Sequence, residues 1–274
     1  MMPLLTVLRR AAACLVLSAM AAALAATGAA AADPPSREAR IRAAGQLRVC
    51  IWPAYFAISY RDPKTGQLEG LDIDMAKALA ADLGVRPAFV DSTFATFMDD
   101  LEADRCDIAM FGVGITERRR QRVAFSTPTL RSGLYAVTTK AQTRIRTWND
   151  IDQRGNVVAV QDGTFMEPLM RNALKKATIT VVAPPRTREA EIESGRADVF
   201  ISDFPYTRLV VRTHDWVQVI EPSDMIAPTD YAYAMKPGDA AWLARVDAFV
   251  AAAKADGRLA KAADRFGLTP ILRK

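Results

Sequence analysis

Histidine is nearly absent from this chain of 274 residues: His214, in the polar segment RTHDW, is the only one. A histidine-rich metal site or a serine–histidine–aspartate triad would have to be built around that one side chain. The sequence also lacks a GxxxxGKS or GxxxxGKT phosphate loop, and the glycine pair in FGVGIT lacks the third glycine of a dinucleotide-binding turn. We therefore expect neither a metal site nor a bound cofactor.

Basic residues interleaved with aromatic ones, which are typical of nucleic-acid-binding grooves, are missing as well. The formal net charge of the whole chain is only +5. Beyond the N-terminal region, no apolar run approaches the roughly 20 residues that a membrane span requires. The sequence therefore predicts no nucleic-acid partner, and no membrane span after that region.

The apolar run near the N-terminus has the pattern of a secretory signal peptide. Arg9 and Arg10 precede an alanine- and leucine-rich stretch, residues 11–26, and small residues follow up to Ala32. A single membrane anchor is the alternative, but the run is short, rich in alanine and followed by a cleavage pattern. We expect residues 1–32 to be a signal peptide that is cleaved near Ala32, which leaves an exported chain.

Cysteine is scarce, and only two of the three cysteines follow residue 32. Cys50 and Cys106 each lie at or beside a predicted strand, and export places them where disulfides persist. If the strands near Val49 and Ile108 lie side by side, the two sulfur atoms come within bridging distance. Two buried thiols that pack as small hydrophobic groups are the alternative.

Predicted strands and helices alternate along the chain, which indicates an α/β fold with parallel sheets. Asp72 is the expected N-cap of the first long helix. A first unit has strands at 47–52, 87–90 and from 108, and helices at 71–83 and 95–103. A second has strands at 157–161, 178–182 and 197–202, and helices at 166–176 and 189–194. The segment 230–235 leads the chain back to helices at 240–255 and 258–266.

A buried strand that opens into glycines and arginines is the most distinctive motif. The apolar run from Ile108 is followed by Gly112 and Gly114, which allow close approach of a ligand to the backbone. Thr116 is expected to cap a helix that carries three arginines, of which helical geometry turns only one or two back over the turn. Three arginines on a solvated helix face are the alternative reading of the motif.

Parallel sheets bind ligands beyond the carboxyl ends of their strands, and each notable turn lies at such an end. These turns contain Tyr55, residues 112–119, residues 163–165 and Asp203. Two lobes that face each other across these ends would form a cleft. A guanidinium from one lobe and a carboxylate from the other would then hold both charged ends of a small zwitterion.

Residues 46–268 resemble the periplasmic solute-binding proteins of amino-acid ABC transporters, which are family 3 proteins with the type II periplasmic binding fold. The resemblance rests on LEGLDIDMAKALAADLG, DIAMFGVGITERR with VAFSTP, VAVQDGTF, GRADVFISD and ADGRLAKAADRFG, in that order. It implies two lobes, each a parallel-rich sheet flanked by helices, with two hinge crossovers near residues 136–140 and 228–234. Lobe 1 would comprise residues 33–137 and 232–274, and lobe 2 residues 138–231.

The same resemblance implies a function without chemical change to the ligand. A monomer in the periplasm would capture a small amino acid or related carboxylate by hinge closure and deliver it to an ABC transporter permease. In this role Arg119 would grip the α-carboxylate of the ligand and Asp203 its α-ammonium group. Tyr55 would lie on the ligand, and Thr164 would donate from its hydroxyl and amide.

Four further positions depart from the family pattern. Gly112 and Gly114 stand where many members have serines, so that backbone amides remain but hydroxyls are lost. Phe111 and Phe165 replace smaller polar residues. Together with Trp52 and Phe56, these changes indicate an apolar or aromatic ligand, unless Phe111 and Trp52 belong to the core.

A second resemblance points to an enzyme. The segments FSTPTLRSG, IDQRGNVVAV and GRADVFISD are similar to those of periplasmic cyclohexadienyl dehydratases, which act on prephenate or arogenate. Glu167 would then be the general acid that helps expel hydroxide, and Asp203 would bind substrate. The alternative for Glu167 is a carboxylate that is favoured by the first turn of a helix. A third similarity, through LRVC and DRCD, is to exported binding-protein homologues found beside quinoprotein dehydrogenases.

Overall fold

The computed structural model describes residues 36–274. The expected signal peptide, residues 1–32, and its cleavage site near Ala32 lie outside the described residues. Within residues 36–274, none of the helices combines the length and the apolar character that a membrane span needs.

The first of two large sheets has six strands and is built around β5 (Ile108–Gly114), every residue of which is buried. This burial is what the unbroken apolar run predicts for a central strand that is covered on both faces. Across the sheet the order is β4 (Arg86–Asp91), β1 (Gln46–Ile51), β5, β13 (Thr229–Met235) and β6 (Ala124–Phe125), and β7 (Leu130–Ser132) pairs with β13. Strand β1 pairs in parallel with β4 and β5, whereas β13 pairs antiparallel to β5.

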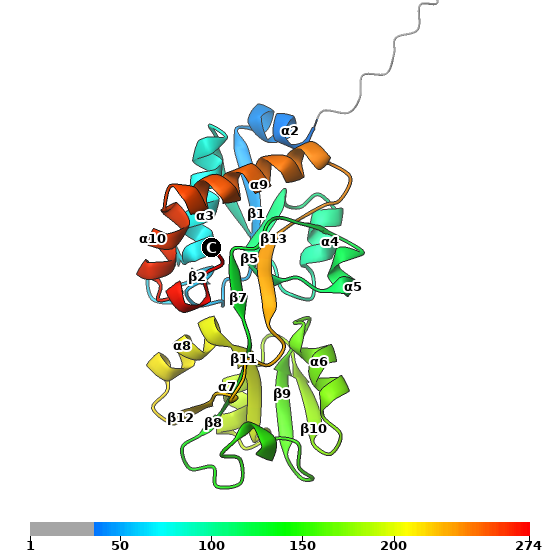
Figure 1. Ribbon diagram of the computed structural model, residues 1–274, viewed down its shortest axis with the longest axis vertical. Helices are drawn as coiled ribbons and strands as arrows, with labels where there is room; N and C mark the ends of the chain where they lie inside the picture. Colours follow the sequence, from blue (N-terminus) through cyan, green and yellow to red (C-terminus); the bar gives the residue numbers. More distant parts are fainter. Residues whose placement is uncertain (1–35) are drawn as a thin grey trace, which may run out of the picture. The chain divides into compact units, whose positions relative to one another are not determined.

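Helices surround this sheet on both sides (Figure 1). The long helix α9 (Ala240–Ala255) buries the bulky side chains of Trp242 and Phe249, and α10 (Arg258–Arg265) packs on α3 (Leu71–Asp82). The other helices of this unit are α2 (Arg37–Ala44), α4 (Phe97–Glu102) and α5 (Glu117–Arg120). A hairpin of β2 (Tyr60–Arg61) and β3 (Leu68–Glu69) and the short 3-10 helix η2 (Thr269–Ile271) complete it.

The second large sheet has five strands. One of its faces has a hydrophobic cluster of its own, with Val158 and Ile201, whereas Ala159 and Phe200 belong to the cluster that continues into the first unit. The order is β10 (Thr178–Val182), β9 (Val157–Gln161), β11 (Val199–Asp203), β8 (Leu134–Thr139) and β12 (Val217–Ile220). Strand β9 pairs in parallel with β10 and β11, and β8 pairs antiparallel with β11 and β12. The helices are α6 (Met166–Ala173), α7 (Arg188–Glu193) and α8 (Phe204–Thr213), with the 3-10 helix η1 (Trp148–Asp150).

The fold is therefore a two-lobed α/β fold, and the chain passes between its sheets twice. The first passage lies at Gly133, between β7 in the first sheet and β8 in the second. The second precedes β13, at about Ala227. Because β8 belongs wholly to the second sheet, we propose lobe boundaries a few residues earlier than the sequence predicts: lobe 1 as residues 36–133 and 228–274, and lobe 2 as residues 134–227.

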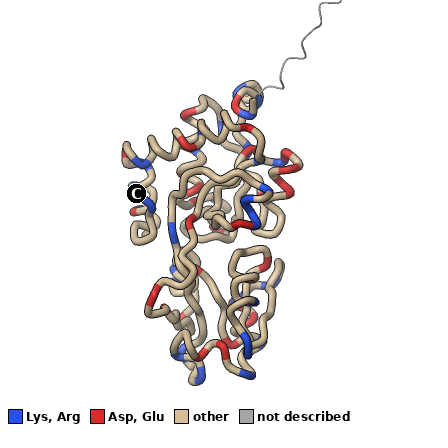
Figure 2. Tube along the Cα trace, turned by 45° about the vertical axis from the view of Figure 1, so that its right-hand side comes forward, with Lys and Arg blue, Asp and Glu red and all other residues tan. Residues whose placement is uncertain are grey.

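Paired charges lie at these crossovers and over both lobes. Arg131 on β7 donates from Nε and Nη2 to the two carboxylate oxygens of Asp230 on β13, at 2.7 Å each. This bidentate pair joins the strand that precedes the first crossover to the strand that follows the second. Elsewhere basic and acidic residues are interspersed along the trace (Figure 2).

Two local predictions are wrong. Gly112 and Gly114 do not begin a turn, because β5 continues through both of them. Gly114 pairs with Tyr231 of β13, and Gly112, with φ at 63°, lies where the register with β13 shifts. Asp72 does not cap α3, since the helix begins at Leu71 after Gly70 and has no side-chain cap. The Asp72 carboxylate is instead buried and accepts a hydrogen bond of 2.7 Å from the amide of Gly112.

Burial raises the pKa of Asp72 to about 7, against an ordinary value of 3.8. A raised pKa means that the folded chain holds a proton which the unfolded chain releases between about pH 4 and pH 7. The resulting stabilisation is fully present below pH 4 and is lost as the pH rises through 7. At about 1.4 kcal/mol per pKa unit, the loss is on the order of 4 kcal/mol.

Asp72→Asn should remove this dependence. Relative to the unmodified chain, the variant should gain free energy of unfolding as the pH rises from 4 to 8, and urea unfolding at each pH measures the gain. Asp74→Asn, in the same helix but paired with Arg265 near the surface, controls for loss of a carboxylate. Unfolding curves for Asp72→Asn and the unmodified chain that shift with pH in parallel would contradict this assignment.

A disulfide joins Cys50 on β1 to Cys106, which lies two residues before β5. The sequence leaves a bridge and two buried thiols as alternatives, and the structure has the bridge. The register explains it, because Val49 pairs with Ile108 and Cys50 with Ala109 in the neighbouring strands. The bridge therefore ties the second-outermost strand of the first sheet to the strand that leads into the site.

Candidate functional site

A narrow pocket lies where the two lobes meet, at the carboxyl ends of β1, β9 and β11. The cavity that its walls enclose has a volume of about 20 Å³, which leaves room for little more than one water molecule. The lining residues are Trp52, Tyr55, Phe94, Gly112, Gln161, Thr164, Phe165, Met166, Arg188, Ser202, Asp203, Tyr206 and Tyr231.

Asp203 stands at the centre of a hydrogen-bond cluster that joins the lobes. It ends β11 in lobe 2, and its Oδ2 accepts from the hydroxyls of Tyr55 and Tyr231, the latter at 2.6 Å. Its Oδ1 accepts from the amide of Tyr206 at 3.3 Å, so that Asp203 also caps α8. Burial raises the pKa of Asp203, and burial raises the pKa of both tyrosines well above 10. The two phenols are therefore neutral donors at physiological pH.

Arg119 is the one buried arginine of the cluster at 118–120, because Arg118 and Arg120 are exposed. Thr116 caps α5 by accepting from the amide of Arg119, as the sequence predicts. The guanidinium donates from Nη1 to the carbonyl of Gly114 at 2.7 Å and from Nη2 to the carbonyl of Gly163 in lobe 2 at 3.1 Å. Burial lowers its pKa to about 10, so the group stays charged at neutral pH.

Arg119 does not itself line the pocket, and its guanidinium lies against two aromatic rings. Its Cζ lies 5.7 Å from the ring centroid of Phe94, which does line the pocket, and 5.4 Å from that of Phe97. Phe111 lies further back, with its ring centroid 5.0 Å from that of Phe94, and is fully buried. Phe111 is thus a core residue in this structure, which is one of the two alternatives that the sequence leaves open.

The glycines of β5 make room for aromatic rings. A Cβ atom at Gly112 would lie 2.9 Å from Cε1 of Tyr55, and one at Gly114 would lie 3.0 Å from Cδ1 of Phe165. Gly112 borders the pocket, but its amide is occupied by Asp72, and Gly114 does not border the pocket. In this arrangement neither position offers the free amide that the sequence suggests.

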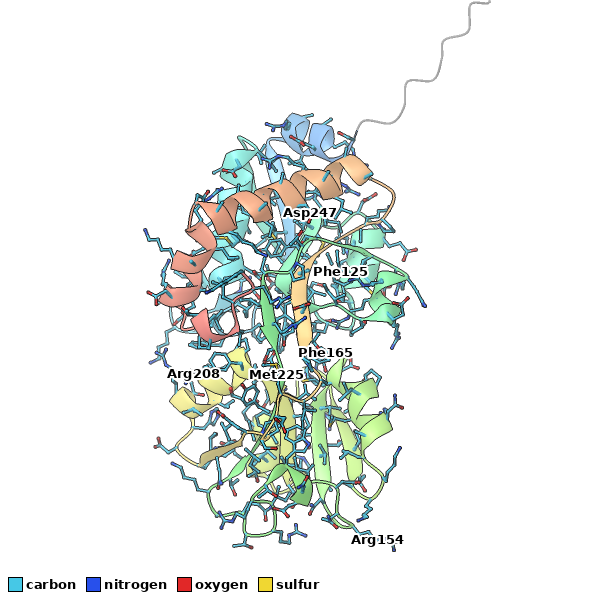
Figure 3. The ribbon with its side chains drawn as sticks, viewed as in Figure 1. Phe125, Arg154, Phe165, Arg208, Met225 and Asp247 are labelled. Carbon is cyan, nitrogen blue, oxygen red and sulfur yellow. A yellow bond between two sulfur atoms is a disulfide. The ribbon has the colours of Figure 1, made fainter. Side chains whose placement is uncertain are left out.

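The turn after β9 brings lobe 2 residues to the pocket. Thr164 lines it, but both its amide and its hydroxyl donate to the carbonyl of Gln161, at 3.3 and 2.8 Å. Phe165 lies beside β13 (Figure 3), with its ring centroid 6.4 Å from that of Tyr231. The preceding Gly163 abuts the other lobe, since a Cβ there would lie 2.3 Å from the amide nitrogen of Ala95. The two lobes are in direct contact around the pocket.

Glu167, the alternative catalytic residue, is outside the pocket. Its Oε1 accepts from Nε and Nη2 of Arg171, one turn further along α6, at 3.1 and 3.0 Å. Met166, the residue before it, is buried and lines the pocket instead. At the start of α6 the pocket wall therefore carries a thioether and no carboxylate.

The sequence does not predict several of the residues that line the pocket, and the most important of them is Arg188 at the start of α7. Its segment PPRTREA reads as a polar surface loop, yet only 3% of the residue is exposed. The signal that was available is its position beyond the carboxyl end of β10, which is the same rule that selects the other turns. Phe94 follows β4 in the same way, and Tyr231 lies in the alternating segment of β13.

Comparisons with known proteins show the family of this chain. Residues 47–269 match the family model of bacterial extracellular solute-binding proteins, family 3. The chain is 35% identical to a cyclohexadienyl dehydratase of Pseudomonas aeruginosa over 225 residues, which covers 82% of this chain and 83% of that protein. It is 25% identical to the L-cystine-binding protein TcyJ of Escherichia coli over 222 residues, or 80% of this chain and 82% of the relative.

Solved structures give the same picture. An ancestral amino acid-binding protein that is a precursor of cyclohexadienyl dehydratase superimposes with a TM-score of 0.77 at 31% identity, covering 84% of this chain and 99% of that one. A mutant of ArgBP from T. maritima superimposes with a TM-score of 0.72 at 27% identity, covering 84% and 98%. Binding proteins and a dehydratase lineage therefore both occur among the relatives.

Proposed function

The chain belongs to the bacterial extracellular solute-binding proteins of family 3, and within that family we propose that it captures a small carboxylate-bearing solute and delivers it, chemically unchanged, to an ABC transporter permease. The ligand is a small amino acid or a related carboxylate. Capture takes place in the periplasm by closure of the two lobes about the crossovers at Gly133 and Ala227.

The observation that carries this proposal is the pocket between the lobes, with walls that touch each other directly. Asp203 of lobe 2 binds Tyr55 and Tyr231 of lobe 1, and Arg119 of lobe 1 binds the Gly163 carbonyl of lobe 2. Because the cavity between the lobes has a volume of only about 20 Å³, a ligand enters only when these contacts break. Separation of the lobes breaks all of them at once, which is the behaviour that a hinge-closing receptor requires.

Arg119 supports a carboxylate as the bound group. Its Nη2 gives up the Gly163 carbonyl when the lobes separate, while Nη1 stays on Gly114 within its own lobe. A carboxylate that enters then accepts from the freed nitrogen, in a site shielded from water by Phe94 and Phe97. Relatives that are named as binding arginine and cystine are consistent with this ligand class.

A thermal-shift screen of the mature chain, residues 33–274, against amino acids, opines and aromatic acids tests the proposal. A ligand at a hundred times its dissociation constant stabilises the folded state by about 2.7 kcal/mol. For a domain of this size that corresponds to a rise in Tm of roughly 5–10 °C. The proposal fails if no carboxylate in the screen raises the Tm.

A dehydratase is the second candidate, since the chain shares 35% identity with the Pseudomonas aeruginosa enzyme. Such an enzyme needs an acid beside the leaving hydroxyl. Glu167 is held by Arg171 away from the pocket, and Met166 occupies the wall from which it would act. These contacts favour binding over catalysis, and turnover of prephenate separates the two.

A further inference from the structure

We propose that Arg188 is a second anion-binding residue of the pocket, and that the pocket prefers a compact, apolar or aromatic carboxylate without an amino group over a zwitterionic amino acid. This inference rests on the proposed function and narrows its ligand class. It concerns a residue of lobe 2 that lies opposite the Arg119 side of the site.

Arg188 is a buried guanidinium with spare donors. Its Nη1 donates to the carbonyl of Ile201 at 2.9 Å and to the hydroxyl of Ser202 at 3.3 Å. Its Nε is buried and has no hydrogen-bond partner within residues 36–274. A guanidinium carries five N–H groups, so most of its donor capacity remains for a ligand.

The positive charge of Arg188 is also not neutralised by any carboxylate in contact with it among residues 36–274. In the described part of the chain it forms no ion pair with a carboxylate, and it lies instead over aromatic rings, with Cζ 4.1 Å from the centroid of Tyr206 and 5.0 Å from that of Phe200. The neighbouring Glu189 is buried too, but it does not line the pocket. A buried cation without a paired anion is costly, and an anionic ligand would supply the missing partner.

The surroundings of Asp203 also favour a ligand without an ammonium group. Among the described residues that line the pocket, Asp203 is the one carboxylate, and both of its oxygens already accept hydrogen bonds. A ligand ammonium would have to displace the phenol of Tyr55 or Tyr231 from Asp203. The polar lining therefore favours negative charge, because the Arg188 guanidinium has spare donors and the one lining carboxylate is already satisfied.

The aromatic residues of the lining indicate the kind of group that the ligand carries besides its carboxylate. Trp52 and Tyr206 stack across the lobes, with ring centroids 6.2 Å apart and planes 10° apart. The ring of Phe94 meets Trp52 edge-on, and Phe165 also lines the pocket. Flat aromatic walls suit a planar or apolar group. The amide side chain of Gln161 adds one polar group at the pocket wall.

Matched ligand pairs that differ only in the amino group test the inference. We would titrate the mature chain calorimetrically with 3-phenylpropionate against L-phenylalanine, 4-methylpentanoate against L-leucine, and glutarate against L-glutamate. We expect the amine-free member of at least one pair to bind ten-fold or more tightly than its amino-acid partner. Tighter binding of the amino acid in every pair that binds would overturn the inference while leaving the proposed function intact.

The variant Arg188→Met should weaken the amine-free acid by 30-fold or more and the amino acid by less, because both ligands lose a partner for the carboxylate but only the amino acid is relieved of repulsion between the guanidinium and its ammonium group. The selectivity therefore falls. A merely structural role of Arg188 would weaken the binding of both members equally, and that result would also overturn the inference.

Arg186→Met is the matched control, since Arg186 is exposed in the same loop and donates to the Val181 carbonyl. Ligand affinity in this variant should stay within three-fold of that of the unmodified chain. If Arg188→Met does not fold, the titration of the matched ligand pairs into the unmodified chain still tests the inference. Failure of every carboxylate to bind would instead contradict the proposed function itself.

Discussion

Replacing Arg119 by methionine is expected to weaken ligand binding by about two to three orders of magnitude, while the chain stays folded. Loss of one partner from a buried, hydrogen-bonded charge pair costs roughly 3–4 kcal/mol of binding free energy. Titration calorimetry with the strongest ligand from the screen measures the loss. Circular dichroism and the Tm of the variant confirm that the fold is kept.

The reason lies in the position of the Arg119 side chain. It is 4% exposed, is held on its own lobe by the Gly114 carbonyl and reaches across to the Gly163 carbonyl of lobe 2. Methionine has similar length and fills the space beside Phe94 and Phe97, so the packing survives while the charge and both hydrogen bonds are lost. Replacement of a buried charged group by an apolar one of similar volume is often tolerated by the fold.

Two variants control the Arg119 experiment. Arg118→Met removes an exposed arginine from the same helix and should change affinity by less than three-fold. Arg119→Lys keeps the charge but cannot reproduce the two-armed geometry, so an intermediate loss is expected. Unchanged affinity in a folded Arg119→Met variant would remove Arg119 from the site.

Replacing Cys50 and Cys106 together by alanine should lower the free energy of unfolding by about 4 kcal/mol. The bridge closes a loop with a sequence separation of 56 residues, and the chain-entropy estimate for a loop of this size is about 4 kcal/mol. Both residues are fully buried beside the central strand, so truncation adds a packing loss. For a domain of this size the fall in Tm is roughly 8–16 °C.

The unmodified chain provides the control for the disulfide. Reduction should lower its Tm toward that of the double variant, and alkylation of the unfolded, unreduced mature chain should add no mass. Each single variant, Cys50→Ala or Cys106→Ala, leaves one free thiol and should lose most of the same stability. Modification of two thiols without reductant would show that the bridge does not form.

Local sequence patterns predict the elements of this fold well. The strands Val157–Gln161 and Thr178–Val182 and the helix Ala240–Ala255 have the bounds that periodicity and turn residues indicate. Such elements are specified by neighbours in the sequence, namely by the alternation of apolar side chains and by caps and glycines at their ends. The alternation of these elements also suffices to indicate parallel pairing around β1 and β9.

What the sequence mispredicts depends on contacts between distant segments. Gly112 resembles a turn residue but lies inside a strand, where its positive φ of 63° and the ring of Tyr55 packed against it both favour glycine. Asp72 has the pattern of a helix cap, but the amide of Gly112, forty residues away, holds it in the core. Arg188 reads as a surface arginine because nothing near it in the sequence shows that Tyr206 and Phe200 will cover it.

The central claim is that the pocket holds a carboxylate without changing it. The most direct test equilibrates the mature chain with prephenate and the carboxylates of the screen, separates free from bound small molecules, and quantifies both by mass spectrometry. We predict that one carboxylate is retained at one molecule per chain and is recovered unchanged, with prephenate no more altered than in buffer alone. Conversion of prephenate to product in amounts that exceed the protein would contradict the claim.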